Sequence, residues 1–259
     1  VDKRIYMVVN FLFPTVVFFV IAIVNKMPLM YPFILLLSLV ILRAVLNYVG
    51  TIVGFKSMEE APNAGYSLMI QKGYAVYTLF AAVLLYGSEV SVFKFFISGF
   101  ILVCAGLIAW ERGKKVNRIN YRWVLYALTA MFCFGTIALS GKFFAQAGIA
   151  AVPQLFWISL ATLALTGADT VRVRVKKQLM DWKIWALLCV LGISVSGFYF
   201  FKLTAEISAP NLGYVGTINA ASNAVYTVIV ALLFGDSLTW KKFAAVGGMT
   251  VGIALLLFS

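Results

Sequence analysis

Histidine is absent from this chain of 259 residues, and carboxylates are scarce, with nine Asp and Glu in all. The lack of histidine removes imidazole acid–base chemistry, the commonest metal ligand and any proton relay through that ring. The three cysteines, Cys104, Cys133 and Cys189, lie far apart and show no CxxC or other metal spacing. We therefore expect no metal site, and we interpret the cysteines as small core residues.

Enzyme signatures are missing as well. The sequence contains no glycine-rich dinucleotide loop, no phosphate-binding P-loop, no GxSxG nucleophile motif and no His/Cys cluster. The sequence therefore predicts no cofactor and no enzymatic activity. Any ATP-driven process would need a separate subunit.

Charge is also low: 12% of the residues are charged and 63% are hydrophobic, whereas a soluble domain is nearer a quarter charged and half apolar. A membrane-spanning helix needs about 20 apolar residues. Nine runs meet that length: 5–24, 31–54, 63–86, 92–110, 121–146, 150–168, 183–203, 211–234 and 241–258. We expect an all-α integral membrane protein with about nine transmembrane helices.

The net charge of +12 would suggest a nucleic-acid partner in a soluble protein. Here most basic residues gather in short loops, above all 111–122 and 169–183. The positive-inside rule places those loops in the cytoplasm, with the N-terminus inside and the C-terminus outside. We therefore expect no nucleic acid as a partner, but the lipid bilayer of a plasma (bacterial inner) membrane.

An internal repeat organises the chain. The pattern Ala-Pro-Asn-x-Gly-Tyr occurs at 61–66 and again 148 positions later, at 209–214. The spans that contain these two copies, 63–86 and 211–234, are the third and the eighth of the nine. Successive spans alternate in direction, and these two are an odd number of spans apart, so they cross the membrane in opposite directions. Such an inverted repeat is typical of secondary transporters. We assign the first repeat to residues 1–110, with four spans, and the second to 121–259, with five, which predicts a ten-helix architecture whose first helix is missing.

Short polar turns flank the penultimate span of each half. They are residues 206–210 with 235–239 in the second half, and 59–62 with 87–91 in the first. This arrangement resembles the EamA-like members of the drug/metabolite transporter superfamily, which have two five-helix halves. The resemblance implies a secondary transporter. Members usually keep both termini in the cytoplasm, whereas the charges here place the C-terminus outside.

Polar side chains inside spans are costly and usually face a cavity or a partner. Ser67, Gln71, Tyr74 and Thr78 form one helical stripe, and the shifted positions in the other copy stay mostly polar. The predicted substrate-binding residues are Arg43, Asn47, Gln71, Lys72, Tyr74, Thr78, Asn219, Ser222, Asn223 and Tyr226. The alternatives are interhelical hydrogen bonds for the stripes and snorkelling or internal pairing for the two bases.

No carboxylate lies in the middle of a span, so an anionic group of a substrate is the expected partner of Arg43 or Lys72. The sequence thus predicts a carrier, in the direction of export, for a small amino acid-like, zwitterionic or anionic metabolite, working by alternating access. A membrane-embedded lipid-processing protein and a structural or assembly protein remain alternatives. The spacing of Gly248 and Gly252 also allows a homodimer.

Overall fold

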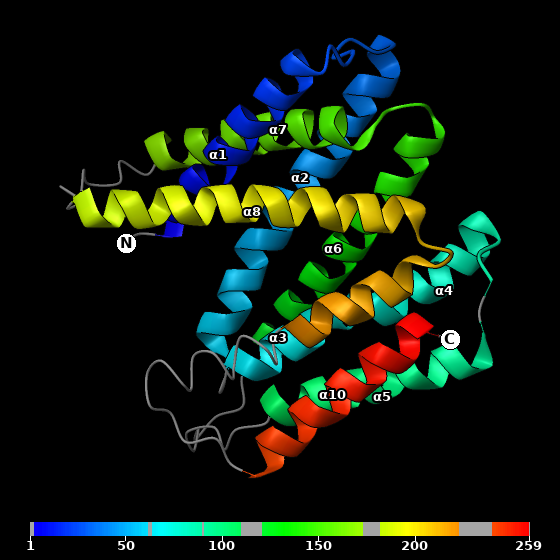
Figure 1. Cartoon of the computed structure of the whole chain (residues 1–259). Helices are drawn as coiled ribbons and strands as arrows, with labels where there is room; N and C mark the ends of the chain where they lie inside the picture. The colour runs from blue at the N-terminus through cyan, green and yellow to red at the C-terminus, as the bar shows by residue number, and fades with distance from the viewer. Residues whose placement is uncertain are drawn as a thin grey trace. The chain divides into compact units, whose positions relative to one another are not determined.

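The computed structural model describes residues 3–61, 64–89, 91–109, 121–172, 182–222 and 240–258, and these residues are almost entirely helical with no strand. The helices are α1 Lys3–Val24, α2 Phe33–Glu60, α3 Ala64–Lys72, α4 Tyr74–Tyr86, α5 Val92–Ala109, α6 Arg122–Gln146, α7 Ala151–Arg172, α8 Trp182–Ser208 and α10 Trp240–Phe258 (Figure 1). Residues 212–222 are also helical. The prediction of an all-α protein is confirmed.

Within the described ranges, six helical segments are long and apolar enough to cross a membrane. They are Arg4–Val24, Phe33–Glu60, Tyr66–Tyr86, Arg122–Gln146, Ala151–Arg172 and Trp185–Ser208. Helices α5 and α10 contain the shorter apolar stretches Val92–Cys104 and Phe243–Leu256. These features are those of a membrane protein, and the count of nine spans stays a prediction.

Gly73 divides the predicted span 63–86 into α3 and α4. Its N–H lies 3.0 Å from the Ile70 carbonyl and 3.2 Å from the Met69 carbonyl, a tightened and shared turn. A Cβ atom at Gly73 would lie only 2.9 Å from the Ile70 oxygen. The absence of a side chain therefore lets the segment tighten here and still continue as α4.

The chain forms two compact units, each built from two stretches of sequence. Unit 1 contains Val1–Tyr48 and Ser140–Ser208, and unit 2 contains Val49–Leu139 and Ala209–Ser259. Unit 1 therefore takes one stretch from each predicted repeat, whereas the stretch Val49–Leu139 of unit 2 contains residues of both. The division into repeats at 1–110 and 121–259 stays a prediction.

In unit 1, α1 packs against α7 and α8. At one end of the α1–α7 pair, Arg4 Nε donates to Asp169 Oδ2 at 2.9 Å. Toward the other end, the Phe19 and Phe156 ring centroids lie 5.5 Å apart. Because residue numbers rise along α1 as they fall along α7, these two helices are antiparallel. The buried core here consists of Phe18, Ala22, Val152, Leu155, Phe156 and Leu203.

In unit 2, α5 packs against α10, also antiparallel (Figure 1). A Cβ atom at Gly248 would lie 3.1 Å from Cys104 Sγ and 3.2 Å from Phe100 Cζ, and one at Gly252 would lie 2.6 Å from Ile101 Cγ1. These glycines therefore let the two helices approach closely. The pair that suggested a homodimer thus packs against α5 of the same chain, and the homodimer stays a prediction.

The helix bounds follow the repeat spacing. Adding 148 to the bounds of α1 gives 151–172, the bounds of α7. The same shift turns α2 into 181–208 and α5 into 240–257, against 182–208 for α8 and 240–258 for α10. Two pairs of counterparts, α1 with α7 and α5 with α10, each pack together within one unit.

Candidate functional site

Arg43 of α2 is the centre of a buried polar cluster in unit 1, with 3% of its surface exposed. Its Nη1 donates to Gln154 Oε1 at 2.6 Å. Gln154, fully buried in α7, donates through Nε2 to the carbonyl of Ile149 at 2.8 Å and to that of Gly141 at 3.3 Å. These three bonds fix the orientation of the Gln154 amide and, through it, the guanidinium.

Gly141 of α6 makes room for that guanidinium. A Cβ atom at this position would lie 3.3 Å from Arg43 Nη2 and 2.7 Å from Leu203 Cδ1. Both contacts are closer than side chains normally make, so a larger residue would push Arg43 or α8 away. The glycine therefore brings α2, α6 and α8 together around one charged group.

Glu206 lies in the last turn of α8 and is 3% exposed, the only buried carboxylate among the described residues. Its Oε1 lies 3.6 Å from Lys202 Nζ, one helical turn earlier. The carboxylate also interacts electrostatically with Arg43. We define Arg43, Gln154 and Glu206 as the polar centre.

The polar centre corrects one expectation from the sequence. Glu206 does lie at a span end, as expected, but Arg43 has an acidic neighbour, whereas the sequence predicted none. The reason is that α8 continues to Ser208 and carries Glu206 into the interior of unit 1. Arg43 Nε and Glu206 Oε1 are buried, and neither has a hydrogen-bond partner in the described part of the chain.

Asn47 lies one helical turn after Arg43 in α2. Its Nδ2 is 3.5 Å from the hydroxyl of Thr162 in α7, at the outer limit of a hydrogen bond. Asn47 therefore adds a second, weaker link between α2 and α7. Arg43 and Asn47 both belong to unit 1.

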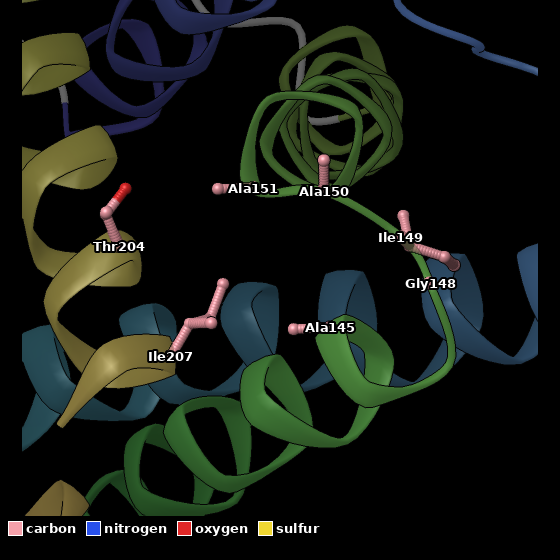
Figure 2. A pocket seen from close by; sticks show the side chains of 7 residues that line it. All are labelled: Ala145, Gly148, Ile149, Ala150, Ala151, Thr204 and Ile207. Carbon is pink, nitrogen blue, oxygen red and sulfur yellow. The ribbon is translucent and has the colours of Figure 1, made fainter. Parts of the chain in front are cut away.

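A cavity of about 330 Å³ lies in unit 1, between the end of α6, the start of α7 and α8 (Figure 2). Its wall is apolar apart from Thr204 and backbone atoms. On each of the three helices that form the wall, a residue close to Arg43 lies one helical turn from a residue of the wall. The pairs are Gly141 with Ala145, Gln154 with Ala150 and Leu203 with Ile207, each four residues apart. Since residues four apart share a helix face, the polar centre lies about one turn, roughly 5.4 Å, beyond the cavity wall.

In unit 2, the structure brings together Tyr74 of α4 and Asn219. Asn219 Nδ2 donates to the buried Tyr74 hydroxyl oxygen at 2.7 Å. The two helices also pack closely beside this bond. A Cβ atom at Gly213 would lie 2.6 Å from the Cα atom of Leu79, and one at Gly216 would lie 3.0 Å from the Cα atom of Ala75. The polar stripe of 63–86 therefore does contact the helix at 212–222.

Gln71 has a different environment. Its Nε2 donates to Ser57 Oγ and Ser67 Oγ, both at 3.0 Å, and to the Gly54 carbonyl at 3.3 Å. The two serine hydroxyls also bond to each other. Gln71 thus joins α2 to α3, in agreement with the alternative that these polar groups form interhelical hydrogen bonds.

The other predicted residues of unit 2 are less enclosed or bond within their own helix. Thr78 is buried and donates to the Ala75 carbonyl at 3.1 Å. Ser222 is exposed and donates to the Asn219 carbonyl at 2.7 Å, and Lys72 is half-buried. Asn223 and Tyr226 lie outside the described residues.

Two residues of the polar centre were missed by sequence reasoning. Gln154 was a neutral amide within an apolar run, and Glu206 lay in the short polar turn that follows the apolar run 183–203. One signal was available: Lys202 and Glu206 have the i, i+4 spacing of a helical ion pair, which indicates that the helix continues past the apolar run.

The chain matches no protein-family model and no curated protein. Among solved structures, it is similar to a crystal structure of a protein with a TM-score of 0.80 and 13% sequence identity. The similarity covers 100% of this chain and 88% of that one. It shows that the helical fold of the whole chain also occurs in a solved protein, and it concerns the fold alone.

Proposed function

We propose that this protein is a secondary carrier, which moves a small organic metabolite across a plasma (bacterial inner) membrane by alternating access. The observation that carries the proposal is the shift of 148 residues that relates the bounds of α1 to α7, α2 to α8 and α5 to α10. Inverted repeats give a carrier two related conformations, each open to one side. The antiparallel packing of α1 on α7 and of α5 on α10 supports such a repeat.

The packing is also reciprocal, as a twofold relation requires. Cys104 lies against Gly248, which is the counterpart of Phe100, and Phe100 lies against Gly252, which is the counterpart of Cys104. This reciprocity supports the ten-helix EamA-like architecture, with repeats at 1–110 and 121–259. The basic loops favour a cytoplasmic N-terminus. As the direction of transport we propose export.

We propose candidate substrate contacts in each unit taken by itself. Arg43 and Asn47 are the candidates in unit 1, since Arg43 is a buried cation with an unmatched N–H. The candidates in unit 2 are Gln71, Lys72, Tyr74, Thr78, Asn219 and Ser222, and the sequence adds Asn223 and Tyr226. A guanidinium binds a carboxylate or phosphate strongly, so we propose a zwitterionic or anionic metabolite as the substrate, with no cofactor.

Counterflow in proteoliposomes tests this proposal. Vesicles loaded with an unlabelled amino acid or organic acid should accumulate the same labelled compound only when the protein is present. The Arg43→Gln variant should lose most of this uptake, whereas Glu60→Gln, at an exposed position, should keep it. Lack of counterflow with every member of a broad metabolite panel would refute the carrier and favour a structural or lipid-processing protein.

A further inference from the structure

The polar centre contains one unmatched donor and one unmatched acceptor. Arg43 Nε carries an N–H, and Glu206 Oε1 is a carboxylate oxygen; both are buried without a hydrogen bond among the described residues, and the carboxylate oxygen has only the ion-pair contact with Lys202 Nζ at 3.6 Å. Buried polar atoms in proteins are nearly always paired, so an unmatched pair in one cluster indicates that another group completes it. A group that offers an acceptor and a donor side by side would satisfy both atoms.

The charges of the polar centre restrict that group further. Arg43 and Glu206 are both 3% exposed and of opposite sign, so their charges largely balance. A ligand with a net negative charge would be repelled by Glu206, and one with a net positive charge by Arg43. Burying an additional uncompensated charge is unfavourable, so a net-neutral ligand fits best.

Lys202 is the other charged group facing Glu206 from its own helix. Its side chain is 24% exposed, against 4% for Glu206, so water screens the ammonium much more than the buried pair. Its long stem also lets the ammonium reach toward the helix end. Lys202 therefore moderates the charge of Glu206 without making the cluster a general anion site.

The cavity beside the polar centre has room for the rest of such a ligand. Its volume of about 330 Å³ is at the small end of ligand pockets, and its lining is mostly apolar. In Figure 2, Ile207 extends from α8 toward the side where Ala145 of α6 lies. Arg43 and Glu206 do not line the cavity themselves, but Ile207, the chain neighbour of Glu206, does, so a ligand with its head group at the polar centre would direct a small apolar body toward this cavity.

We infer that Glu206 determines the charge of the ligand at Arg43, so that unit 1 binds a net-neutral molecule, either a zwitterion or a neutral amide, and rejects the matching anion and cation. This inference deepens the proposed carrier function and rests on it for the direction of movement. It assigns Glu206 and the cavity to a site in which the sequence had placed only Arg43 and Asn47.

Ligand binding to the purified full chain in detergent tests the inference. The probes share one skeleton and differ in charge: leucine, isocaproamide, isocaproate and isoamylamine. We expect leucine and isocaproamide to raise the thermal unfolding midpoint, and isocaproate and isoamylamine to have little effect. In Glu206→Gln the ratio of isocaproate to leucine affinity should rise at least tenfold, whereas Glu206→Asp and the exposed control Glu60→Gln should keep the wild-type order.

Three results would overturn the inference: a preference of the wild type for isocaproate over leucine, an unchanged ratio in Glu206→Gln, or no response to any probe. If Glu206→Gln does not fold, the wild-type order and Glu206→Asp decide. Counterflow with the same probes separates the two proposals. Charge-selective binding without flux would refute the carrier alone, and flux that favours the anion would refute this inference alone.

Discussion

Gln154→Leu is the substitution that should most clearly expose how unit 1 is held together. Leucine has nearly the volume of glutamine but forms no hydrogen bonds. The change removes the acceptor for Arg43 Nη1 at 2.6 Å and the donor to the Ile149 carbonyl at 2.8 Å. It leaves a buried guanidinium and a buried carbonyl without these partners.

The expected loss follows from those two bonds. A hydrogen bond to a charged group contributes about 1.5–3 kcal/mol, and a neutral one about 0.5–1.5 kcal/mol. The bond to Gly141, at 3.3 Å, is long and adds little. Because interhelical bonds in membrane proteins average only about 0.6 kcal/mol, we expect the lower part of the summed range, about 2–3 kcal/mol.

The free energy of unfolding, measured by titration with a denaturing detergent in mixed micelles, provides the assay. Gln146→Leu is the matched control, since Gln146 is an exposed glutamine at the end of α6, and we expect a change within about 0.5 kcal/mol there. The double variant with Arg43→Leu should lose less than the sum of the single changes, because both remove one bond. Equal effects of Gln154→Leu and Gln146→Leu would refute this account of the polar centre.

Further predictions concern unit 2 and topology. Tyr74→Phe and Asn219→Ala should each lower the unfolding free energy by about 0.6–1.7 kcal/mol, with a non-additive double variant; additivity would mean that the bond contributes nothing. Gly252→Ala should destabilise by about 1–3 kcal/mol in the same assay, because its Cβ would collide with α5. Gly247→Ala, whose Cβ would have no atom of another described helix within 4 Å, should change the free energy of unfolding little, and equal effects of the two substitutions would contradict the packing. A reporter fused after Ser259 should give an external signal; a cytoplasmic signal would reverse the orientation.

Hydropathy predicted the helices well where the apolar run and the helix coincide. The run 121–146 corresponds to α6, Arg122–Gln146, and the run 5–24 to α1, Lys3–Val24. It failed where polar residues continue a helix: α2 reaches Glu60 and α8 reaches Ser208, several residues beyond the predicted 31–54 and 183–203. A helix needs its backbone bonds and not an apolar surface, so hydropathy underestimates its length.

The candidate site was predictable only in part, for a related reason. Arg43 was evident because a charge inside an apolar run is costly. Its partner Gln154 lies 111 residues away in sequence, and pairing at that distance depends on the tertiary contact that this bond makes between α2 and α7, which no local pattern encodes. Glu206 was missed because its burial depends on the extended end of α8. The contact between Tyr74 and Asn219, in contrast, joins the two polar stripes that the sequence placed at corresponding positions of the two repeat copies.

At the interface between α5 and α10, which we call the seam, α5 contributes larger side chains and α10 contributes glycines. Phe100 and Cys104 occupy the positions at which the other helix has Gly248 and Gly252. Two copies of α5 would place larger side chains against each other and clash, and two copies of α10 would place glycines against each other and leave space unfilled. The two helices are thus complementary in volume while equivalent in position, like the two unlike subunits of a heterodimer. Consequently neither half of the chain could rebuild this seam by pairing with a second copy of itself.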